Sequence, residues 1–461
     1  MPRLAFQNRM YFLYSLVTAA GMLLLSPYFL IKGLRQKKYL HNLPDRFGWR
    51  FPPELTMGGE SRGAIWLHAV SVGEALAAVP LARALKERFP ERRLVVSTTT
   101  VTGQAVARER LNFADAVFYF PLDWCGPVRR ALRAARPDAI VVLETEIWPN
   151  FLREAHRARV PVIFVNGRFS DRSFQRLSRA VKLSGGLLRG FVADVLNQAT
   201  LFLMQSEADH ARLISLGASS SRVSVSGNMK YDLAPPSESA LVAWLSAELA
   251  RSRRGPLLVA GSVIAGEEQA VLRAFETVIG KWPDALLLMA PRKPERFDAA
   301  AEIIERAGWR AVRRSVLSLN GASPGNLGSP VGEPRTVFLL DSIGELAAVY
   351  GIADAVFVGG SLEPAGGHNP LEPAALGRPP VFGLSMSNFQ EISDRLLQAD
   401  AALQVRSGEE LGDAWTALLE DESRRIRMGR AAQELVERHR GATTVTLGRI
   451  AGVLAEKRAT R

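Results

Sequence analysis

Residues 359–383 read GGSLEPAGGHNPLEPAALGRPPVFG, and the rest of the chain can be understood from this stretch. An apolar run at 355–358, typical of a buried strand, leads into it. Asn369 is a favoured helix N-cap, Pro370 suits the first helical position, and Glu372 follows at capping-box spacing. Strand, glycine-rich loop and capped helix together are typical of an anion- or nucleotide-binding corner in an α/β fold. A well-capped helix after a strand, without a ligand, is the simpler interpretation.

The second half of the chain repeats the alternation of apolar runs and helical patterns around this corner. The runs lie at 256–262, 285–291, 336–341, 355–360, 379–383 and 401–405. Ser262 ends the first of these runs and Arg292 follows the second, where a hydroxyl and a guanidinium can bind phosphate. The chain contains no GxxxxGK[ST] loop, and no GxGxxG follows the first strand, which disfavours P-loop hydrolases and NAD enzymes. Residues 315–334 read as a surface excursion rich in Gly, Ser and Pro.

The first half has the same α/β pattern. Its apolar runs lie at 64–70, 93–99, 116–122, 138–144, 161–167, 201–206 and 223–228. Strands that alternate with helices predict a parallel sheet, whose ligands bind at the carboxyl ends of the strands. A turn-rich break at 234–239 separates the two halves.

Two groups of carboxylates follow strands of the first half. Glu74 stands after the first run, as a general base over an acceptor hydroxyl or as the Glu of a capping box with Ser71. The same S-x-G-E pattern recurs at 342–345, which supports the capping alternative. Glu144 and Glu146 follow the fourth run, and we expect one to face the ligand while the other caps the next helix.

The N-terminal stretch 11–31 (YFLYSLVTAAGMLLLSPYFLI) carries no charge. At ~1.5 Å per residue it is long enough to cross a ~30 Å hydrocarbon core. Basic residues are more frequent after it than before it, so the positive-inside rule predicts a single-pass anchor with the main body in the cytoplasm. The alternative is a buried or interfacial helix.

The composition of the chain favours some binding partners and excludes others. Hydrophobic content of 47% and charged content of 23% are those of a globular protein. The net charge of +12 suits an anionic membrane surface or a phosphorylated substrate, and nucleic acid is disfavoured because the arginines are spread through many segments. The single cysteine, Cys125, excludes an intrachain disulfide and a Cys-based zinc cluster, and the six histidines show no metal-binding spacing.

Six motifs in order resemble those of the 3-deoxy-D-manno-octulosonic acid (Kdo) transferases, a family of GT-B glycosyltransferases. They are WLHAVSVGE, ETEIWPNF, VNGRFSDRS, SGNMKYD, MAPRKPER and the opening stretch. The resemblance implies an α/β chain with two Rossmann-like domains facing a cleft and an N-terminal membrane-anchor helix. The expected limits are 1–38 for the anchor and its basic flank, 39–233 for the acceptor-binding domain and 237–461 for the CMP-Kdo-binding domain.

The resemblance also implies a reaction. The family transfers Kdo from CMP-Kdo to a lipid A precursor, lipid IVA, at the cytoplasmic face of the inner membrane, with inversion and without a metal or cofactor. Glu74 matches its proposed general base. The second important carboxylate matches Glu146 or Glu144, and Glu146 is preferred. The expected donor-binding residues are Ser262, Arg292, Asn369, Glu372 and Lys230, the last with Asn228 near the interdomain cleft.

Two other functions remain as alternatives. One is a different GT-B sugar-nucleotide enzyme, a UDP-sugar transferase or a 2-epimerase; Glu363 and Glu372 resemble the paired glutamates of such enzymes, but their spacing differs. The other is a basic membrane-anchored scaffold, which leaves the glycine corner and the carboxylates unexplained.

Overall fold

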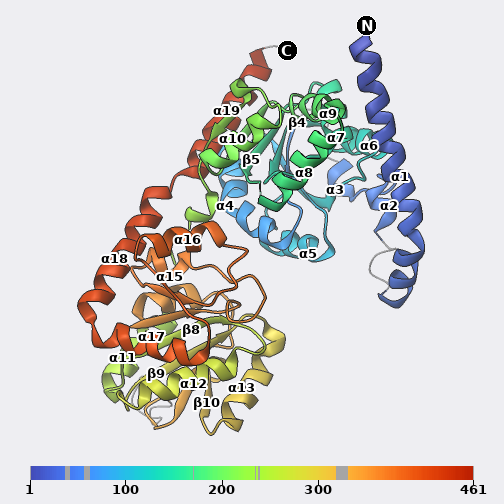
Figure 1. Cartoon of the computed structure of the whole chain (residues 1–461). Helices are drawn as coiled ribbons and strands as arrows, with labels where there is room; N and C mark the ends of the chain where they lie inside the picture. Colours follow the sequence, from blue (N-terminus) through green and yellow to red (C-terminus); the bar gives the residue numbers. More distant parts are fainter. Residues whose placement is uncertain are drawn as a thin grey trace. The chain divides into compact units, whose positions relative to one another are not determined.

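The computed structural model divides the chain into two compact units (Figure 1). Unit 1 comprises Met1–Asp232 and Arg440–Arg461, and unit 2 comprises Leu233–His439. The structure describes residues 2–36, 42–56, 63–169, 171–233, 235–236, 239–317 and 331–459. Most of the predicted excursion at 315–334 therefore lies outside the described residues.

Unit 1 is built on a seven-stranded parallel sheet in the order β3-β2-β1-β4-β5-β6-β7. Its strands are β1 (Ala64–His68), β2 (Arg93–Thr98), β3 (Ala116–Tyr119), β4 (Pro137–Leu143), β5 (Val162–Gly167), β6 (Leu201–Met204) and β7 (Val223–Val225). Each lies within one of the seven apolar runs or starts one residue from it, so the strand predictions for this half are confirmed. The runs are apolar throughout because helices cover both faces of the sheet.

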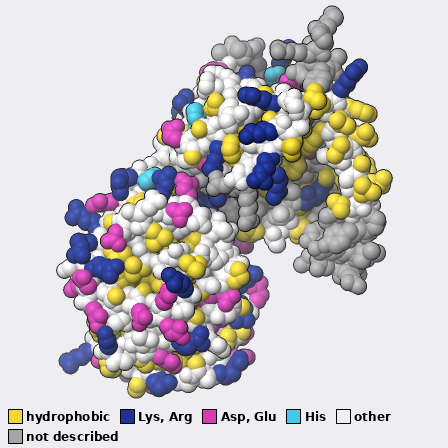
Figure 2. Space-filling view, in the orientation of Figure 1, with side chains coloured by type: hydrophobic (Ala, Val, Ile, Leu, Met, Phe, Trp, Pro, Cys, Tyr) yellow, Lys and Arg dark blue, Asp and Glu magenta, His cyan; other side chains and the backbone are white. Residues whose placement is uncertain are grey.

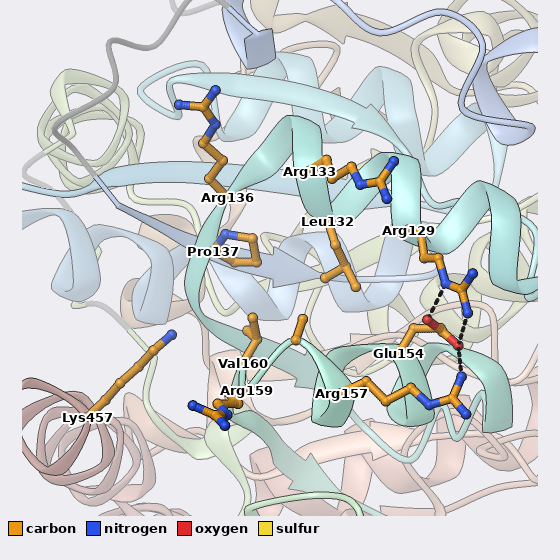
Figure 3. A pocket seen from close by; sticks show the side chains of 11 residues that line it. Arg129, Leu132, Arg133, Arg136, Pro137, Glu154, Arg157, Arg159, Val160 and Lys457 are labelled. Carbon is orange, nitrogen blue, oxygen red and sulfur yellow. Dashed lines mark hydrogen bonds and ion pairs between the residues drawn. The ribbon is translucent and has the colours of Figure 1, made fainter. Parts of the chain in front are cut away.

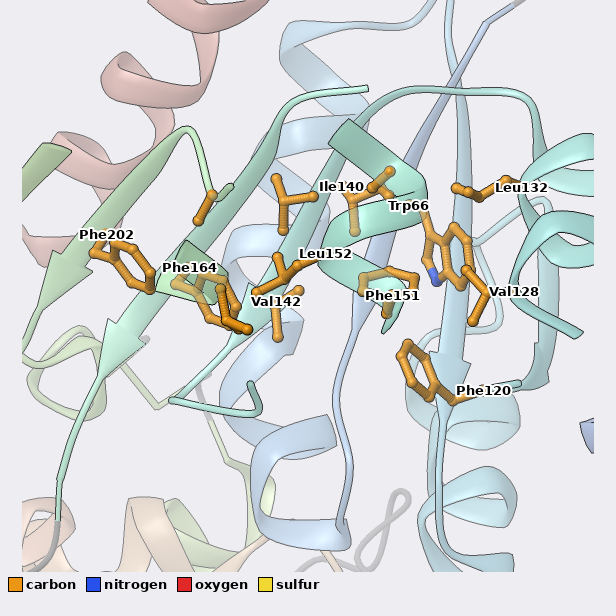
Figure 4. Packing of buried hydrophobic residues seen from close by; sticks show 14 of the residues in the cluster. Trp66, Phe120, Val128, Leu132, Ile140, Val142, Phe151, Leu152, Phe164 and Phe202 are labelled. Atoms are coloured by element: carbon orange, nitrogen blue, oxygen red, sulfur yellow. The ribbon is translucent and has the colours of Figure 1, made fainter. Parts of the chain in front are cut away.

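Helices bury the two faces of this sheet in separate clusters. The helices of unit 1 are α1 (Pro2–Gln36), α2 (Leu43–Arg46), α3 (Pro53–Thr56), α4 (Val72–Arg88), α5 (Val101–Arg110), α6 (Cys125–Ala135), α7 (Pro149–Arg157), α8 (Asp171–Leu183), α9 (Leu187–Leu196), α10 (Glu207–Ser215) and α19 (Ala442–Ala459). On one face, Trp66, Phe120 and Phe151 pack with the aliphatic side chains of α6 and α7 (Figure 4). The other face packs beneath α4 and α5.

The end of the chain returns to unit 1, so the expected C-terminal domain 237–461 is wrong at its end. Ile450 and Leu454 of α19 are buried in the cluster that α4 and α5 cover. The Asp232 carboxylate accepts the N–H groups of Gly441 (2.6 Å) and Thr443 (2.5 Å), which fixes the start of α19. The sequence pattern showed a helix here but not which sheet it covers.

Unit 2 has a second seven-stranded parallel sheet, in the order β10-β11-β9-β8-β12-β13-β14. Its strands are β8 (Leu257–Val263), β9 (Leu286–Pro291), β10 (Arg310–Arg313), β11 (Thr336–Leu339), β12 (Ala355–Val358), β13 (Pro380–Phe382) and β14 (Leu403–Gln404). Its helices are α11 (Ala240–Ser252), α12 (Glu268–Ile279), α13 (Phe297–Arg306), α14 (Leu346–Val349), α15 (Leu371–Ala375), α16 (Gln390–Gln398), α17 (Gly408–Glu420) and α18 (Glu422–His439). Strand β10 was not predicted, because an edge strand that reads RAVR has no apolar run.

Both sheets thus have the doubly wound arrangement that the sequence predicted. In unit 1 the order of strands reverses direction between β1 and β4, and in unit 2 between β8 and β12. Loops at such a switch point splay apart and leave room for a ligand at the carboxyl ends of the strands. The carboxylates Glu74, Glu144 and Glu146 follow β1 and β4, and the stretch 359–383 follows β12.

Candidate active site

Glu74 lies in the first turn of α4, at the switch point of unit 1. Its side chain is 8% exposed. One carboxylate oxygen accepts the Val70 N–H (2.8 Å) and the other accepts the Ser71 hydroxyl (2.9 Å), while Ser71 caps the helix. Glu74 is therefore the Glu of a capping box, as the simpler interpretation predicted. Each carboxylate oxygen has a second lone pair, so this role leaves Glu74 able to accept a proton.

Two further carboxylates act on Glu74 electrostatically. Burial raises the pKa of Glu74 to about 7, and the negative charges of Glu144 and Glu146 add to that rise against the hydrogen bonds from Val70 and Ser71. Burial, followed by the charge of Glu144, also raises the pKa of Glu146. A carboxyl group that titrates near neutral pH at a strand end is suited to general base catalysis.

Neither Glu144 nor Glu146 caps the next helix, so that expectation is wrong. Asp123 does so instead: its carboxylate accepts the N–H groups of Asn150 (3.2 Å) and Phe151 (2.7 Å) at the start of α7. Asp123 follows β3, and nothing in the local sequence of α7 indicates a cap from another loop. Glu144 has a left-handed backbone (φ 55°), a conformation that non-glycine residues adopt at some cost and that is frequent in functional sites.

Sequence reasoning also missed His68, the last residue of β1. The ring is fully buried, stacks on Phe120 with centroids 3.9 Å apart, and contacts the Ser97 hydroxyl through Nδ1 (2.9 Å). Burial lowers the pKa of His68 to about 3, so the ring is neutral. Its Nε2 has no hydrogen-bond partner among the described residues. The only signal was its place at the end of the WLH run.

In unit 2, the glycine-rich loop is organised by a buried carboxylate that the sequence analysis did not single out. Glu267 is fully buried and accepts the N–H groups of Gly360 (2.7 Å), Ser361 (2.9 Å) and Leu362 (2.9 Å). These loop N–H groups are therefore already engaged by protein, unlike those of a phosphate-binding glycine loop. The loop is a rigid support for the residues that follow it.

Two of the predicted donor-binding residues, Asn369 and Glu372, follow this loop, and two others, Ser262 and Arg292, lie on and after neighbouring strands. Asn369 accepts the Leu371 N–H (3.1 Å) and donates to Glu372 (3.4 Å), so the two predicted corner residues do contact each other. Burial raises the pKa of Glu372, and the hydrogen bond from Asn369 and the charge of Arg292 oppose that rise. Arg292 is exposed, and its backbone N–H donates to Val263 (2.8 Å), which places it next to the end of β8.

Ser262 lies on β8, again with a left-handed backbone (φ 55°). A side chain at Gly359 would place its Cβ 2.5 Å from the Ser262 carbonyl oxygen, so glycine is required for the loop to pack here. Burial, followed by the charge of Arg292, lowers the pKa of His368 to about 4. Its Nε2 lacks a hydrogen-bond partner among the described residues. His368 is thus a second histidine, after His68, that the sequence did not point to.

Lys230 differs from the other predicted donor-binding residues because it belongs to unit 1. It follows β7 in a short 3₁₀ turn, where the Asn228 side chain accepts the Lys230 N–H (3.0 Å). Asn166, buried at the end of β5, accepts the Met229 N–H (3.0 Å) and so ties this turn to the carboxyl edge of the sheet.

A cationic pocket lies away from these residues, between α6 and α7 (Figure 3). Its volume is about 680 Å³, and its charged lining consists of Arg129, Arg133, Arg136, Glu154, Arg157, Arg159 and Lys457. Glu154 is held by Arg129 (2.5 Å) and Arg157 (2.9 Å). The pocket is at the amino edge of the sheet, next to the start of β4, and contains none of the predicted site residues. Within the described part of the chain, no three His, Cys, Asp or Glu side chains form a group that could hold a metal ion.

Known proteins resemble this chain in sequence and fold. A family described as "3-Deoxy-D-manno-octulosonic-acid transferase (kdotransferase)" matches residues 41–233. The 3-deoxy-D-manno-octulosonic acid transferase of Haemophilus influenzae is 33% identical, covering 89% of this chain and 90% of its own. That of Bordetella pertussis is 34% identical, covering 87% and 89%. The structure of Anabaena HepE in complex with UDP is 17% identical, with a TM-score of 0.51, and covers 85% of this chain and all of its own, a likeness of fold alone.

Proposed function

We propose, from the premise that this chain belongs to the Kdo transferase family, that it transfers Kdo from CMP-Kdo to a lipid A precursor, lipid IVA, with inversion and without a metal ion. Membership rests on the 33% identity to the Haemophilus influenzae enzyme over 89% of the chain. The chain is thus a glycosyltransferase that acts in lipopolysaccharide biosynthesis. The same match favours this function over a UDP-sugar transferase, a 2-epimerase or a scaffold.

Glu74 is the general base of the proposed reaction. Its carboxylate takes the proton from a sugar hydroxyl of the acceptor while the hydroxyl oxygen bonds to the anomeric carbon of Kdo. The bond from that carbon to the phosphate of CMP breaks at the same time, and its electron pair leaves with CMP. The observation that supports this role is the place of Glu74, which is 8% exposed in the first turn of α4 at the carboxyl end of β1. Burial raises its pKa to about 7, which strengthens it as a base near neutral pH.

Glu146 is the second functional carboxylate. It follows β4, at the same strand edge, and burial, followed by the charge of Glu144, raises its pKa. Its negative charge, with that of Glu144, raises the basicity of Glu74. Glu146 thereby sets the proton affinity of the base, and its carboxyl group is available to a hydroxyl of the acceptor.

Ser262, Arg292, Asn369, Glu372 and Lys230 bind the donor. The Arg292 guanidinium stabilises the negative charge that develops on the CMP phosphate as the bond breaks. Asn369 donates a hydrogen bond to Glu372. In the proposed complex, the Glu372 carboxylate accepts hydrogen bonds from the ribose or the base, and the Asn369 amide can both donate and accept them.

The protein is anchored at the inner membrane, with both units on the cytoplasmic side. One described helix segment, Asn8–Ser26, is long and apolar enough to cross a membrane. A lipid acceptor is embedded in the bilayer, so an enzyme held at that surface meets it at high local concentration.

A donor panel tests this function. Purified full-length protein is given lipid IVA with CMP-Kdo or with a set of UDP-sugars, and release of the nucleotide is followed. We expect CMP release only when CMP-Kdo and the lipid are both present. Consumption of a UDP-sugar in place of CMP-Kdo would overturn the proposal.

A further inference from the structure

Polar side chains of helix α1 contact the rest of unit 1. An ordinary amphipathic helix, in contrast, packs its apolar side against the protein. Tyr11 is 2% exposed; its hydroxyl donates to Asp194 (3.2 Å) and accepts from Gln198 (2.5 Å). Its ring also packs edge-on against Phe191. Three further hydrogen bonds join the same face to the body: Tyr14 to Asp123 (2.9 Å), Asn150 to Ser15 (3.0 Å) and Trp124 to Thr18 (3.2 Å). Residues 11, 14, 15 and 18 are spaced to lie on one helix face.

The opposite face of α1 is apolar and exposed. Its large side chains are Phe12 (70% exposed), Leu13 (50%), Leu16 (55%), Val17 (61%), Leu23 (74%) and Leu24 (80%). Leu25 (55%), past Thr18, lies on the other side of the helix and is exposed there too. These side chains form the densest band of hydrophobic side chains in the space-filling view (Figure 2). In water this exposure would be costly, because each large apolar side chain that is left unburied forgoes its favourable transfer out of water. The face therefore needs an apolar partner.

We propose that α1 lies in the plane of the membrane, with its outer face in one leaflet and its polar face on unit 1, and does not span the bilayer. A span over Asn8–Ser26 would take the docked segment from Tyr11 to Thr18 into the hydrocarbon. Asp123, Asp194 and Asn150 would go with it, because they are bonded to that segment. Charged groups at that depth cost several kcal/mol each. An in-plane helix buries only its apolar face, ~5–10 Å deep.

The charges at the ends of α1 fit the same orientation. The helix contains no Asp or Glu; Arg3 and Arg9 stand near its start, and Lys32 and Arg35 near its end. Basic residues at both ends complement anionic headgroups of a single leaflet, whereas a span favours them on the cytoplasmic side only. The bilayer is thus the partner whose chemistry matches both the apolar face and the ends.

The direction of α1 relates the membrane to the active site. Asn8 contacts Arg153, in the middle of α7, while Ser15 contacts Asn150 in its first turn. Helix α7 starts at the carboxyl edge of the sheet, so α1 runs antiparallel to it and continues past that edge (Figure 1). Leu23, Leu24 and Leu25 therefore lie toward the edge that carries Glu74. This inference deepens the proposed function and rests on it only in the choice of lipid acceptor.

Side-specific labelling tests the orientation. In a Cys125→Ser background, one cysteine is placed at the start of α1 (Arg3→Cys) and another in an exposed turn of unit 1 (Ser220→Cys). A membrane-impermeant maleimide is applied to spheroplasts and to inverted inner-membrane vesicles. We expect both cysteines to react in inverted vesicles and neither in spheroplasts. Reaction of Arg3→Cys in spheroplasts, with Ser220→Cys reacting only in inverted vesicles, would overturn the inference.

A second measurement addresses the apolar face. The double variant Leu16→Ser and Leu24→Ser should float with phosphatidylglycerol vesicles at least ~10-fold less than the unchanged protein, since each lost side chain weakens insertion. Ile426→Ser, at an exposed apolar position of unit 2, is the matched control. Equal flotation of the double variant and the control would contradict the inference. Both assays are independent of transfer, so a protein with this topology but no Kdo transfer would sink the proposed function alone.

Discussion

Glu74 can both cap a helix and act as a base, two roles that the sequence leaves as alternatives. It completes the capping box of α4 through Val70 and Ser71, and it is a buried carboxyl with a pKa near 7. Glu410 supplies a natural comparison. It accepts the Arg406 N–H (2.8 Å) beside the cap Ser407, which is the same arrangement at the start of α17.

The first prediction separates capping from catalysis. Glu74→Gln should lower the rate of transfer by ~10²–10⁴-fold, because the amide cannot take the acceptor proton, while CMP-Kdo still binds. Glu410→Gln perturbs the same kind of cap and should leave the rate within about twofold of the unchanged enzyme. Steady-state kinetics and donor titration measure both. Near-normal turnover by Glu74→Gln would remove Glu74 as the base.

The second prediction concerns pH. If Glu74 is the base, kcat/KM should rise with pH and level off above about 7, because the carboxylate form is the active one. A profile that is flat between about pH 6 and 8 would contradict the assignment.

The same raised pKa makes a prediction about stability. The folded protein holds the Glu74 proton more tightly than the unfolded chain, so this stabilisation is present below pH ~4.5 and is lost as the pH rises through about 7. Glu74→Gln should therefore gain stability relative to the unchanged protein as the pH rises from 5 to 8, by roughly 3 kcal/mol at most. Urea unfolding at the two pH values tests this; a pH-independent difference would contradict the raised pKa.

The site was predictable residue by residue only in part. The positions of Glu74, Glu146, Ser262, Arg292, Asn369 and Glu372 at strand ends follow from the alternation of apolar runs. Asp123, His68 and Glu267 act through contacts with segments distant in the chain, and no local pattern shows such contacts.

Among the elements, the loop of residues 359–383 differs in the structure from the phosphate-binding loop that its sequence resembles. It begins as a glycine-rich corner that resembles a phosphate cradle, but Glu267 occupies its N–H groups. The loop is a fixed platform that presents Asn369 and Glu372, which are hydrogen-bonded to each other. The predicted cap is wrong, because α15 has Pro370 as its N-cap and no side-chain cap.

A fourth prediction tests this platform. Glu267→Gln replaces an acceptor by a donor opposite buried N–H groups and should destabilise unit 2 by ~2–4 kcal/mol and weaken donor binding. Glu276→Gln, on the exposed side of α12, is the control and should change neither property. Calorimetric unfolding and CMP titration measure the two effects. Full stability of Glu267→Gln would show that the loop does not depend on this carboxylate.

At the scale of the whole molecule, the chain consists of two doubly wound units, and its last helix belongs to the first of them. Strand existence was predictable because fully buried parallel strands are apolar throughout. The packing of α19 on unit 1 was not predictable from the sequence, because a helix that covers one sheet has the same periodicity as a helix that covers the other.

A fifth prediction concerns this packing. Asp232→Ala removes the carboxylate that accepts the Gly441 and Thr443 N–H groups and should destabilise unit 1 by about 1–2 kcal/mol. Hydrogen exchange should increase in residues 442–459. Asp413→Ala, at an exposed position of α17, is the control. Unchanged exchange in α19 would mean that this cap does not hold the helix.

Mass spectrometry of the lipid product is the sharpest test of the proposed Kdo transfer and of Glu74 as its base. Purified full-length protein, and Glu74→Gln beside it, are incubated with CMP-Kdo and lipid IVA. We expect the lipid to gain Kdo and CMP to be released in equal amount with the unchanged protein, and the lipid to stay unmodified with Glu74→Gln. If the folded, unchanged protein leaves the lipid unmodified, the proposed transfer is contradicted. If Glu74→Gln modifies the lipid to the same extent, the role of Glu74 is contradicted.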